Sequence, residues 1–462
     1  MFFPDAAQTL TTNLFRPEPS SKINGASIDT RTLQPGNLFV ALPGTKNDGH
    51  GFLKTAFEKG ASGALVQKDY WSREGSHAPS SWKNILAVPD TAEAFLTLAS
   101  HYRASFPLKA VAVVGSVGKT STKEFLHYLL RQKFPVLATE GNLNNHLGLP
   151  LTLFKLNASH RYCVCELGTN RIGDVRQLAN AFKPDCGLLT RIAPEHLEGF
   201  GSMDNIYEGE LELFHALRPG SAAVIPDDDP LLFQKMAGLN LRWVRVGKTP
   251  GADYQLSDVK TENEKVFFRV NGKFFSFPGV AAFLARNAAM AVAMAEVCGM
   301  SLEEMPEFWG DFKLPSGRFQ EQVFPPGIRV IFDGYNASPA SFEAAVQTFG
   351  EMQATGRKIL VFSDMLELGA GEKDYHETLG RQIAHSKLDG VIAYGVRSKW
   401  SLEMIRRENP QFSVEYVENQ REAASRLEGR LQPGDVLLLK ASRSMKIEEV
   451  LNYLFDSKPI PH

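Results

Sequence analysis

The stretch Ala110–Thr122 reads AVAVVGSVGKTST, and the rest of the chain is organised around it. Ala110–Val114 is an apolar, β-branched run of strand length. It leads into a glycine turn that carries Lys119 and Thr120, and Lys123–Arg131 then has the pattern of a helix. The sequence therefore predicts a strand, a tight turn and a helix in direct succession.

Such a turn can form a cradle for phosphate. Glycines let backbone N–H groups close around an anion, and the helix N-terminus adds a positive dipole. Lys119 supplies a point charge, and Thr120 has the hydroxyl that holds Mg2+ in loops of this kind. The standard pattern has a further glycine where Val113 stands, so this is the shorter G-x-x-G-K-T form. The predicted phosphate-binding residues are Gly115, Ser116, Val117, Gly118, Lys119, Thr120 and Ser121. The alternative is an ordinary strand-to-helix turn with a solvated lysine.

Composition limits the class of protein. The 462 residues suggest about three domains, and 43% hydrophobic with 22% charged residues fits ordinary buried cores. A net charge of −2 argues against a nucleic-acid surface, and no apolar run is long enough to span a bilayer. The N-terminus has no basic region before an apolar core, so we expect no signal peptide. The four cysteines, with no second Cys/His pair at zinc spacing, are expected to be buried thiols of a cytoplasmic enzyme.

The pattern of elements predicts an α/β protein with three domains. Residues 1–106 form a small α/β domain, and residues 107–315 form a central P-loop domain with a mostly parallel sheet. From residue 316 to residue 462 buried strands and helices alternate again, which predicts a doubly wound, Rossmann-like domain. Four strands are expected there, at residues 329–332, 358–362, 391–394 and 436–439.

Polar residues follow the predicted strands of the central domain. The strand Tyr162–Cys165 ends in Glu166, and His196 follows the strand Gly187–Ile192. Ligands gather at the carboxyl ends of strands in doubly wound sheets, so both side chains are candidates for the phosphate site, although a lone histidine is more often structural. A loop with three asparagines, Asn142, Asn144 and Asn145, is expected between two helices and in contact with a ligand.

Two further patterns belong to the central domain. Residues 254–277 alternate apolar and polar around Asn271-Gly272, which indicates a hairpin. The alanine-rich helix 281–298 carries Arg286-Asn287, a polar pair that either faces solvent or contacts a ligand.

These motifs resemble the Mur ligase family, which builds peptidoglycan precursors. The segments that carry the resemblance are GSVGKTST, EGNLNNHLGLPLTL, HLEGFGS, SGRFQ, DGYNASPASFEAA and SDMLELG, and they cover all three domains. The resemblance implies ATP and Mg2+ as cofactors, with a UDP-sugar-peptide bound by the first domain and an incoming amino acid or dipeptide bound partly by the third. It also implies an acyl phosphate formed from a carboxylate, which an amine then attacks, and domains that close around the ligands.

The resemblance also implies roles for individual residues. Thr120 and Glu166 would hold one Mg2+, and His196 would contact a second. Asn287 would meet the adenine and Arg318 the phosphates. Asp333 with Asn336 would lie on the ribose side of ATP, and the UDP end would contact Ser27, Asp29, Thr30 and Arg31. The asparagines of the polar loop are candidates for substrate contact.

Three positions depart from the family's pattern. Glu210 stands where the family commonly has a carbamoylated, metal-binding lysine. A carbamoylated lysine is a carboxylate on a long stem, so Glu210 could supply the charge with shorter reach, or it could lie on a solvated face. Because Glu208 and Glu212 flank it on one helix, Glu210 is expected to face inward only if they face outward. The other departures are Arg286, where a histidine is usual, and His146, where an acidic residue is common.

Other functions remain as alternatives. A different Mur ligase or a folylpolyglutamate synthetase would share the fold, whereas a nucleotide-dependent switch would use the phosphate cradle only for regulation. The sequence has no heptad runs, so a monomer is expected.

Overall fold

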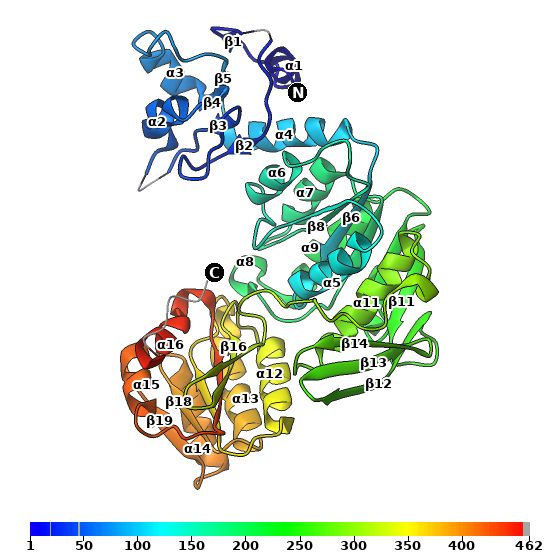
Figure 1. The fold of residues 1–462 in the computed structure, drawn as a ribbon, viewed down its shortest axis with the longest axis vertical. Helices are drawn as coiled ribbons and strands as arrows, with labels where there is room; N and C mark the ends of the chain where they lie inside the picture. Colours follow the sequence, from blue (N-terminus) through cyan, green and yellow to red (C-terminus); the bar gives the residue numbers. More distant parts are fainter. Residues whose placement is uncertain (19, 45–46, 456–462) are drawn as a thin grey trace.

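The computed structural model describes residues 1–18, 20–44 and 47–455, and it has three units arranged along its long axis (Figure 1). Each unit is built on one sheet, of five, nine and six strands in chain order. The fold is α/β with three mostly parallel sheets, as the sequence predicts.

The N-terminal unit has the strand order β1-β5-β4-β3-β2. Only the edge strand β1 is antiparallel to its neighbour. Its strands are β1 (Leu14–Phe15), β2 (Ala26–Ser27), β3 (Leu38–Val40), β4 (Gly63–Gln67) and β5 (Ile85–Val88), and its helices are α1 (Phe3–Thr9), α2 (Leu53–Glu58), α3 (Lys68–Glu74) and α4 (Thr91–Ala104), with a 3-10 turn η1 (Gly49–Phe52).

The central unit has the strand order β14-β13-β12-β11-β10-β9-β6-β8-β7. The strand that precedes the glycine turn, β6, lies inside this sheet between β8 and β9, and all of its residues after Lys109 are buried. Full burial on both faces explains the continuous apolar run in the sequence. The strands are β6 (Lys109–Val114), β7 (Val136–Ala138), β8 (Tyr162–Glu166), β9 (Cys186–Leu189), β10 (Ala222–Pro226), β11 (Arg242–Gly247), β12 (Tyr254–Glu262), β13 (Lys265–Val270) and β14 (Lys273–Pro278).

The helices of the central unit cover both faces of its sheet. Helix α11 packs on α5, and its alanine-rich interior is buried. Small side chains there allow close approach of the two helices. The helices are α5 (Lys119–Arg131), α6 (Gly148–Leu153), α7 (Asp174–Phe182), α8 (Leu197–Phe200), α9 (Met203–Ala216), α10 (Pro230–Lys235) and α11 (Leu284–Val297), and a 3-10 turn η2 (Leu302–Glu304) follows.

Local predictions for the central unit were confirmed with two corrections. Asn271 and Gly272 form the turn of an antiparallel hairpin, in which Val270 pairs with Lys273 and both turn residues have positive φ. Cys163 and Cys165 are buried on one strand with their Sγ atoms 3.7 Å apart. However, helix α5 begins at Lys119 and not at Lys123, because the left-handed Gly118 turns the chain directly into the helix. The asparagine loop follows strand β7 and not a helix.

The C-terminal unit has the strand order β15-β16-β20-β17-β18-β19, with only β15 antiparallel. Helices lie on both faces of this sheet, which makes it doubly wound (Figure 1). The strands are β15 (Gln320–Phe324), β16 (Ile328–Asp333), β17 (Lys358–Phe362), β18 (Gly390–Ala393), β19 (Ser413–Tyr416) and β20 (Val436–Lys440), the helices are α12 (Pro339–Glu351), α13 (Glu372–Ala384), α14 (Ser398–Glu408), α15 (Gln420–Leu427) and α16 (Glu448–Phe455), and the 3-10 turns are η3 (Gly369–Gly371) and η4 (Arg443–Met445).

The four predicted strands of this unit agree with the structure to within one residue at each end. The edge strands β15 and β19 were missed, because both are at least partly exposed and lack a continuous apolar run. No helix in the described part of the chain combines the length and apolar character that a membrane crossing needs.

Candidate active site

A cavity of about 1200 Å³ lies between the central and C-terminal units. The carboxyl ends of parallel strands from both sheets reach it, which is the usual ligand-binding edge of such sheets. Most of the predicted site residues line it, namely Ser116, Val117, Gly118, Lys119, Thr120, Ser121, Asn142, Asn144, Asn145, Glu166, His196, Asn287, Arg318, Asp333 and Asn336.

The backbone of the glycine turn requires both of its glycines. Gly115 has φ +123° and Gly118 has φ +96°. A Cβ on Gly115 would lie 2.3 Å from Oγ1 of Thr190, and one on Gly118 would lie 2.8 Å from the side chain of Asn287. Any larger residue would therefore collide with a neighbour in a backbone conformation it rarely adopts. The first N–H groups of α5 have no partner within the helix and point toward the site.

Lys119 is folded back onto its own loop. Its Nζ donates to the carbonyl oxygen of Gly115 and to Oε1 of Glu195, the latter at 3.2 Å. Burial disfavours the ammonium form, but the nearby carboxylates of Glu195, Glu210 and Glu166 outweigh burial and raise the pKa of Lys119. A raised pKa favours the ammonium form of Lys119, which suits a ligand for phosphate.

Glu166 is held at the end of β8 by two neighbours. Oγ1 of Thr120 donates to its Oε2 at 2.8 Å, and Nδ2 of Asn144 donates to its Oε1 at 2.7 Å. Only 2% of the residue is exposed. This arrangement joins the glycine turn, the asparagine loop and β8, and it places a hydroxyl and a carboxylate side by side beside the phosphate cradle.

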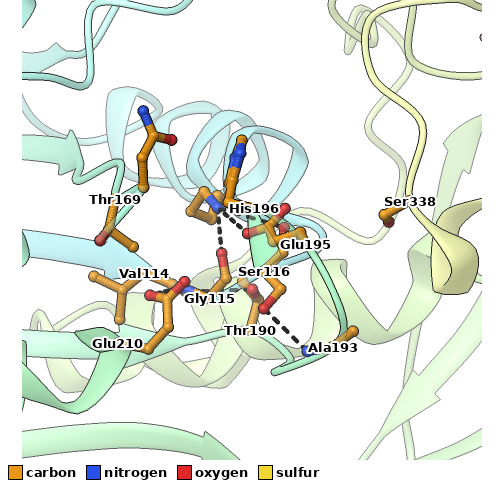
Figure 2. A network of polar contacts seen from close by, with 12 residues as sticks. Val114, Gly115, Ser116, Thr169, Thr190, Ala193, Glu195, His196, Glu210 and Ser338 are labelled. Atoms are coloured by element: carbon orange, nitrogen blue, oxygen red, sulfur yellow. Dashed lines mark hydrogen bonds and ion pairs between the residues drawn. The ribbon is translucent and has the colours of Figure 1, made fainter. Parts of the chain in front are cut away.

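Glu210 does not lie on a solvated face. It is fully buried on α9, its Oε2 accepts the N–H of Gly115 at 2.7 Å, and its Oε1 has no hydrogen-bond partner in the part of the chain that the structure describes. Burial raises its pKa to about 7, against the opposing attraction of Lys119. Figure 2 shows Glu210 and Glu195 reaching the loop from opposite sides.

The condition that both neighbours of an inward-facing Glu210 face outward holds for only one of them. Glu208 is exposed, but Glu212 is buried. Glu212 accepts the backbone N–H groups of Gly173 and Arg176 at 2.9 and 3.0 Å, and it pairs with the Arg176 guanidinium. A carboxylate at the N-terminus of α7 is favoured by the helix dipole, and this interaction offsets the cost of burial.

His196 lies at the start of α8 with a left-handed backbone, φ +49°. Its Nδ1 bonds to the carboxylate of Glu367, which belongs to the C-terminal unit. Among the described residues, Glu166, His196 and Glu210 do not form one cluster that could hold a metal by themselves.

The C-terminal wall of the cavity carries its own charges. Nη2 of Arg318 donates to Oγ1 of Thr120 at 3.2 Å, and its guanidinium lies 4.1 Å from the ring centroid of Tyr335. Asp333 accepts from the N–H of Phe319 at 3.1 Å and from Nζ of Lys440 at 2.6 Å. Burial lowers the pKa of Lys440, although the Asp333 carboxylate opposes this effect.

Asn287 and Arg286, near the start of α11, also line the cavity. Arg286 is not free in solvent, because its Nη1 donates to Asp228 at 2.9 Å. His146 also lines the cavity. Oδ1 of Asn145 accepts the N–H groups of Leu147 and Gly148, so this asparagine shapes the start of α6.

The predicted UDP contacts lie apart from this cavity. Ser27, Asp29, Thr30 and Arg31 belong to the N-terminal unit, and none of them lines it. Arg31 pairs with Asp29 at 2.5 Å, and the hydroxyl of Ser27 donates to the Asp29 carbonyl at 2.8 Å.

Some residues of the site were not predicted as such: Glu195, Tyr335, Glu367 and Lys440. Glu195 stands directly before the segment HLEGFGS, and Glu367 lies within SDMLELG. Nothing in the spacing of either residue predicts which distant chain segment its side chain contacts. Lys440 is a single lysine at the end of an apolar strand, and only its pairing with Asp333 across adjacent strands gives it a role.

A glycine loop at a helix N-terminus, a buried lysine that stays charged and carboxylates facing it define a P-loop protein that binds nucleotide phosphates. Three family descriptions match the chain, "Mur ligase family, catalytic domain" at residues 22–103, "Mur ligase middle domain" at residues 113–295 and "Mur ligase, glutamate ligase domain" at residues 317–443.

Relatives match along nearly the whole chain. UDP-N-acetylmuramoyl-tripeptide–D-alanyl-D-alanine ligase of Bacillus subtilis is 32% identical over 437 residues, 94% of each chain. The crystal structure of MurF from Acinetobacter baumannii superposes with a TM-score of 0.85 at 27% identity over 99% of each chain. MurF from Thermotoga maritima in complex with ADP gives 0.79 at 27% identity, covering 94% and 97% of the two chains. The chain belongs to the Mur ligase family.

Proposed function

We propose that the protein joins D-alanyl-D-alanine to the carboxylate of UDP-N-acetylmuramoyl-tripeptide with ATP, in cytoplasmic peptidoglycan precursor synthesis. The observation that carries the proposal is the phosphate cradle, in which Lys119 remains charged and the hydroxyl of Thr120 donates to Glu166. The Bacillus subtilis relative bears the name of this activity, and the Thermotoga maritima relative binds ADP. Domain limits at 106/107 and 315/316 and a monomeric state belong to the same proposal.

The reaction must make a carboxylate reactive, because oxide is a prohibitive leaving group. Transfer of the γ-phosphoryl group of ATP to a carboxylate oxygen releases ADP and gives an acyl phosphate. The dipeptide amine then attacks the carbonyl carbon, loses a proton, and expels phosphate from the tetrahedral intermediate. Catalysis of this kind depends mainly on positioning and on stabilisation of charge on the phosphoryl oxygens.

The chain's own cations suit that task. In the proposal, Lys119 and the N-terminus of α5 hold the phosphates from the central unit, and Arg318 meets them from the C-terminal unit. Asn287 contacts the adenine, and Asp333 with Asn336 lies on the ribose side. Lys119 must leave its bond to Glu195 to reach a phosphate, which is a short movement within the same cavity.

The donor set fits Mg2+, which typically binds one or two carboxylates and completes its shell with substrate phosphates and water. Oγ1 of Thr120 and the Glu166 carboxylate would hold one ion. Glu210, whose buried Oε1 has no hydrogen-bond partner among the described residues, would supply the carboxylate that a carbamoylated lysine provides elsewhere in the family. His196 would contact a second ion. When bound, Mg2+ neutralises charge that develops on the phosphoryl group.

The UDP end is assigned to Ser27, Asp29, Thr30 and Arg31. Asn142, Asn144 and Asn145 are assigned to substrate because their loop lines the cavity. With the UDP contacts and the phosphate cradle on different units, we propose that the units close together around the ligands and exclude water from the acyl phosphate.

A coupled phosphate-release assay tests the function. With ATP, Mg2+ and the UDP-tripeptide present, we expect phosphate release to depend on added D-alanyl-D-alanine. Release with another amino acid instead would indicate a different Mur ligase, and release with a folate substrate and glutamate would indicate a folylpolyglutamate synthetase. Nucleotide binding without amine-dependent release would indicate a switch, and each of these results would contradict the proposal.

A further inference from the structure

Two side-chain hydrogen bonds between the central and C-terminal units fall on residues assigned to metal binding. Arg318 donates to the hydroxyl of Thr120, and Glu367 bonds to Nδ1 of His196. The two contacts come from different loops of the C-terminal unit, one before β15 and one after β17. Docking of this unit therefore acts directly on the side chains of the proposed metal site.

The contact of Glu367 is held by the backbone as well as by the side chain. The carbonyl oxygen of Glu367 accepts the N–H of Glu198 at 3.3 Å, so the loop is anchored to the first turn of α8. Glu367 and His196 both have left-handed backbones, with φ of +63° and +49°. Non-glycine residues adopt this conformation rarely and at some cost, which marks both positions as fixed by their surroundings.

The hydrogen bond to Glu367 determines which ring nitrogen of His196 carries the proton. An ionised carboxylate is only an acceptor, so Nδ1 of His196 must carry the proton in this contact. In the neutral ring the proton-free atom is then Nε2, the atom that can bind a metal ion. Nε2 of His196 has no hydrogen-bond partner among the described residues, and the residue lines the cavity.

We propose that Glu367 is a positioning residue that holds His196 with Nδ1 protonated, so that Nε2 becomes a free ligand atom in the cavity only when the central and C-terminal units are docked. A carboxylate that orients a metal-binding histidine is a recurring arrangement in metal sites. Here the carboxylate comes from a different unit of the chain, so assembly of the site is coupled to docking. The role of the free Nε2 rests on the proposed function, whereas the protonation pattern of the ring does not.

Nitrogen NMR of the histidine rings tests the pattern in protein free of metal and nucleotide. The chain has 11 histidines, and His196→Asn identifies the signal of interest. At about pH 8.5, well above the ordinary histidine pKa, we expect the wild-type His196 ring to carry its proton on Nδ1. Glu367→Ala should move the proton to Nε2, and Glu367→Gln should keep it on Nδ1, because the side-chain amide oxygen still accepts a hydrogen bond.

Glu198→Ala is the matched control. Glu198 is an exposed glutamate on the other side of the same contact, and only its backbone takes part. Glu198→Ala should leave the nitrogen signal of the His196 ring unchanged. A wild-type ring protonated on Nε2, or a Glu367→Ala ring still protonated on Nδ1, would overturn the proposal.

A Mg2+ titration of turnover tests the consequence. Glu367→Ala should raise the half-saturating Mg2+ concentration by roughly tenfold or more, with an unchanged KM for the UDP-tripeptide, and Glu367→Gln should stay close to wild type. Equal changes in every KM would show a purely structural contact and would contradict the proposal. Because the NMR result does not require ligase activity, a failure of the proposed function would be recognised separately, in the phosphate assay.

Discussion

Lys119 and Lys440 both line the cavity with little exposed side-chain surface, and their surroundings differ. Lys119, on the central wall, has the carboxylates of Glu195, Glu210 and Glu166 near it, and its pKa is raised. Lys440, on the C-terminal wall, has burial as the dominant influence and Asp333 as its carboxylate partner, and its pKa is lowered. The number of nearby carboxylates accounts for the opposite directions of the two pKa shifts. We expect Lys119 to act on a ligand and Lys440 to support the framework.

We expect substitution of Lys119 to lower turnover and substitution of Lys440 to lower stability. Lys119→Ala should lower ATP-dependent phosphate release by roughly a hundredfold to a thousandfold, the usual cost of removing one preorganised charge from a transition state. Steady-state phosphate release with both substrates measures this. Lys133→Ala is the control, since that exposed lysine lies just beyond the other end of α5 and should have no effect. Near-normal turnover of Lys119→Ala would exclude the phosphate cradle.

Lys440 should act on stability instead. Lys440→Met leaves the carboxylate of Asp333 buried with only the N–H of Phe319, and we expect a loss of about 3 kcal/mol of unfolding free energy. The change is measured as a lower midpoint in urea. The double variant Lys440→Met/Asp333→Leu should recover part of the loss, because no unpaired charge remains. An unchanged midpoint in the single variant would show that the pair does not support the framework.

The raised pKa of Glu210 should make the stability of the folded protein depend on pH. Its pKa is raised to about 7 in the folded protein, so the folded state binds more protons than the unfolded state between about pH 4.5 and pH 7. Stability without metal should therefore fall as pH rises through this window. Glu210→Gln should be more stable than wild type by roughly 2–3 kcal/mol at pH 8, and the gain should shrink toward pH 4.5. Urea midpoints in the presence of a chelator test this, and a gain independent of pH would contradict it.

Glu210→Gln should also weaken the response to Mg2+ and lower turnover. If Glu210 supplies a carboxylate to the metal site, Glu210→Gln should raise the half-saturating Mg2+ concentration about tenfold and lower turnover, an effect of about 1.4 kcal/mol. Glu208→Gln, an exposed residue on the same helix, is the control. Wild-type behaviour of Glu210→Gln across a Mg2+ titration would show that the buried carboxylate has no part in metal binding.

The smallest effect is expected at Glu212. Its carboxylate accepts hydrogen bonds at the N-terminus of α7 and has no part in the proposed chemistry. Glu212→Ala should therefore lower the unfolding free energy by about 1 kcal/mol and leave the Mg2+ dependence unchanged. Thermal unfolding and a Mg2+ titration of the same preparation test both statements. A changed Mg2+ dependence would mean that the two neighbouring glutamates share one role.

The sequence predicts much of this architecture, because each buried parallel strand is a continuous apolar run and the glycine turn has a local signature. Local patterns did not identify the partners of Glu210 or Lys440. The condition that Glu212 faces outward when Glu210 faces inward does not hold, because Glu212 is buried against the N-terminus of α7, some 36 residues earlier in the chain. Contacts between distant segments, such as that of His196 with Glu367, follow from the packing of the units, and no spacing of residues in the sequence predicts them.

The most direct test of the account is a crystal structure with a non-hydrolysable ATP analogue and Mg2+. We expect the phosphates at the turn from Gly115 to Ser121, with Lys119 moved from Glu195 onto a phosphate oxygen and a metal ion beside Thr120 and Glu166. Nucleotide bound elsewhere, or a turn that remains closed by Lys119 at saturating analogue, would contradict the account.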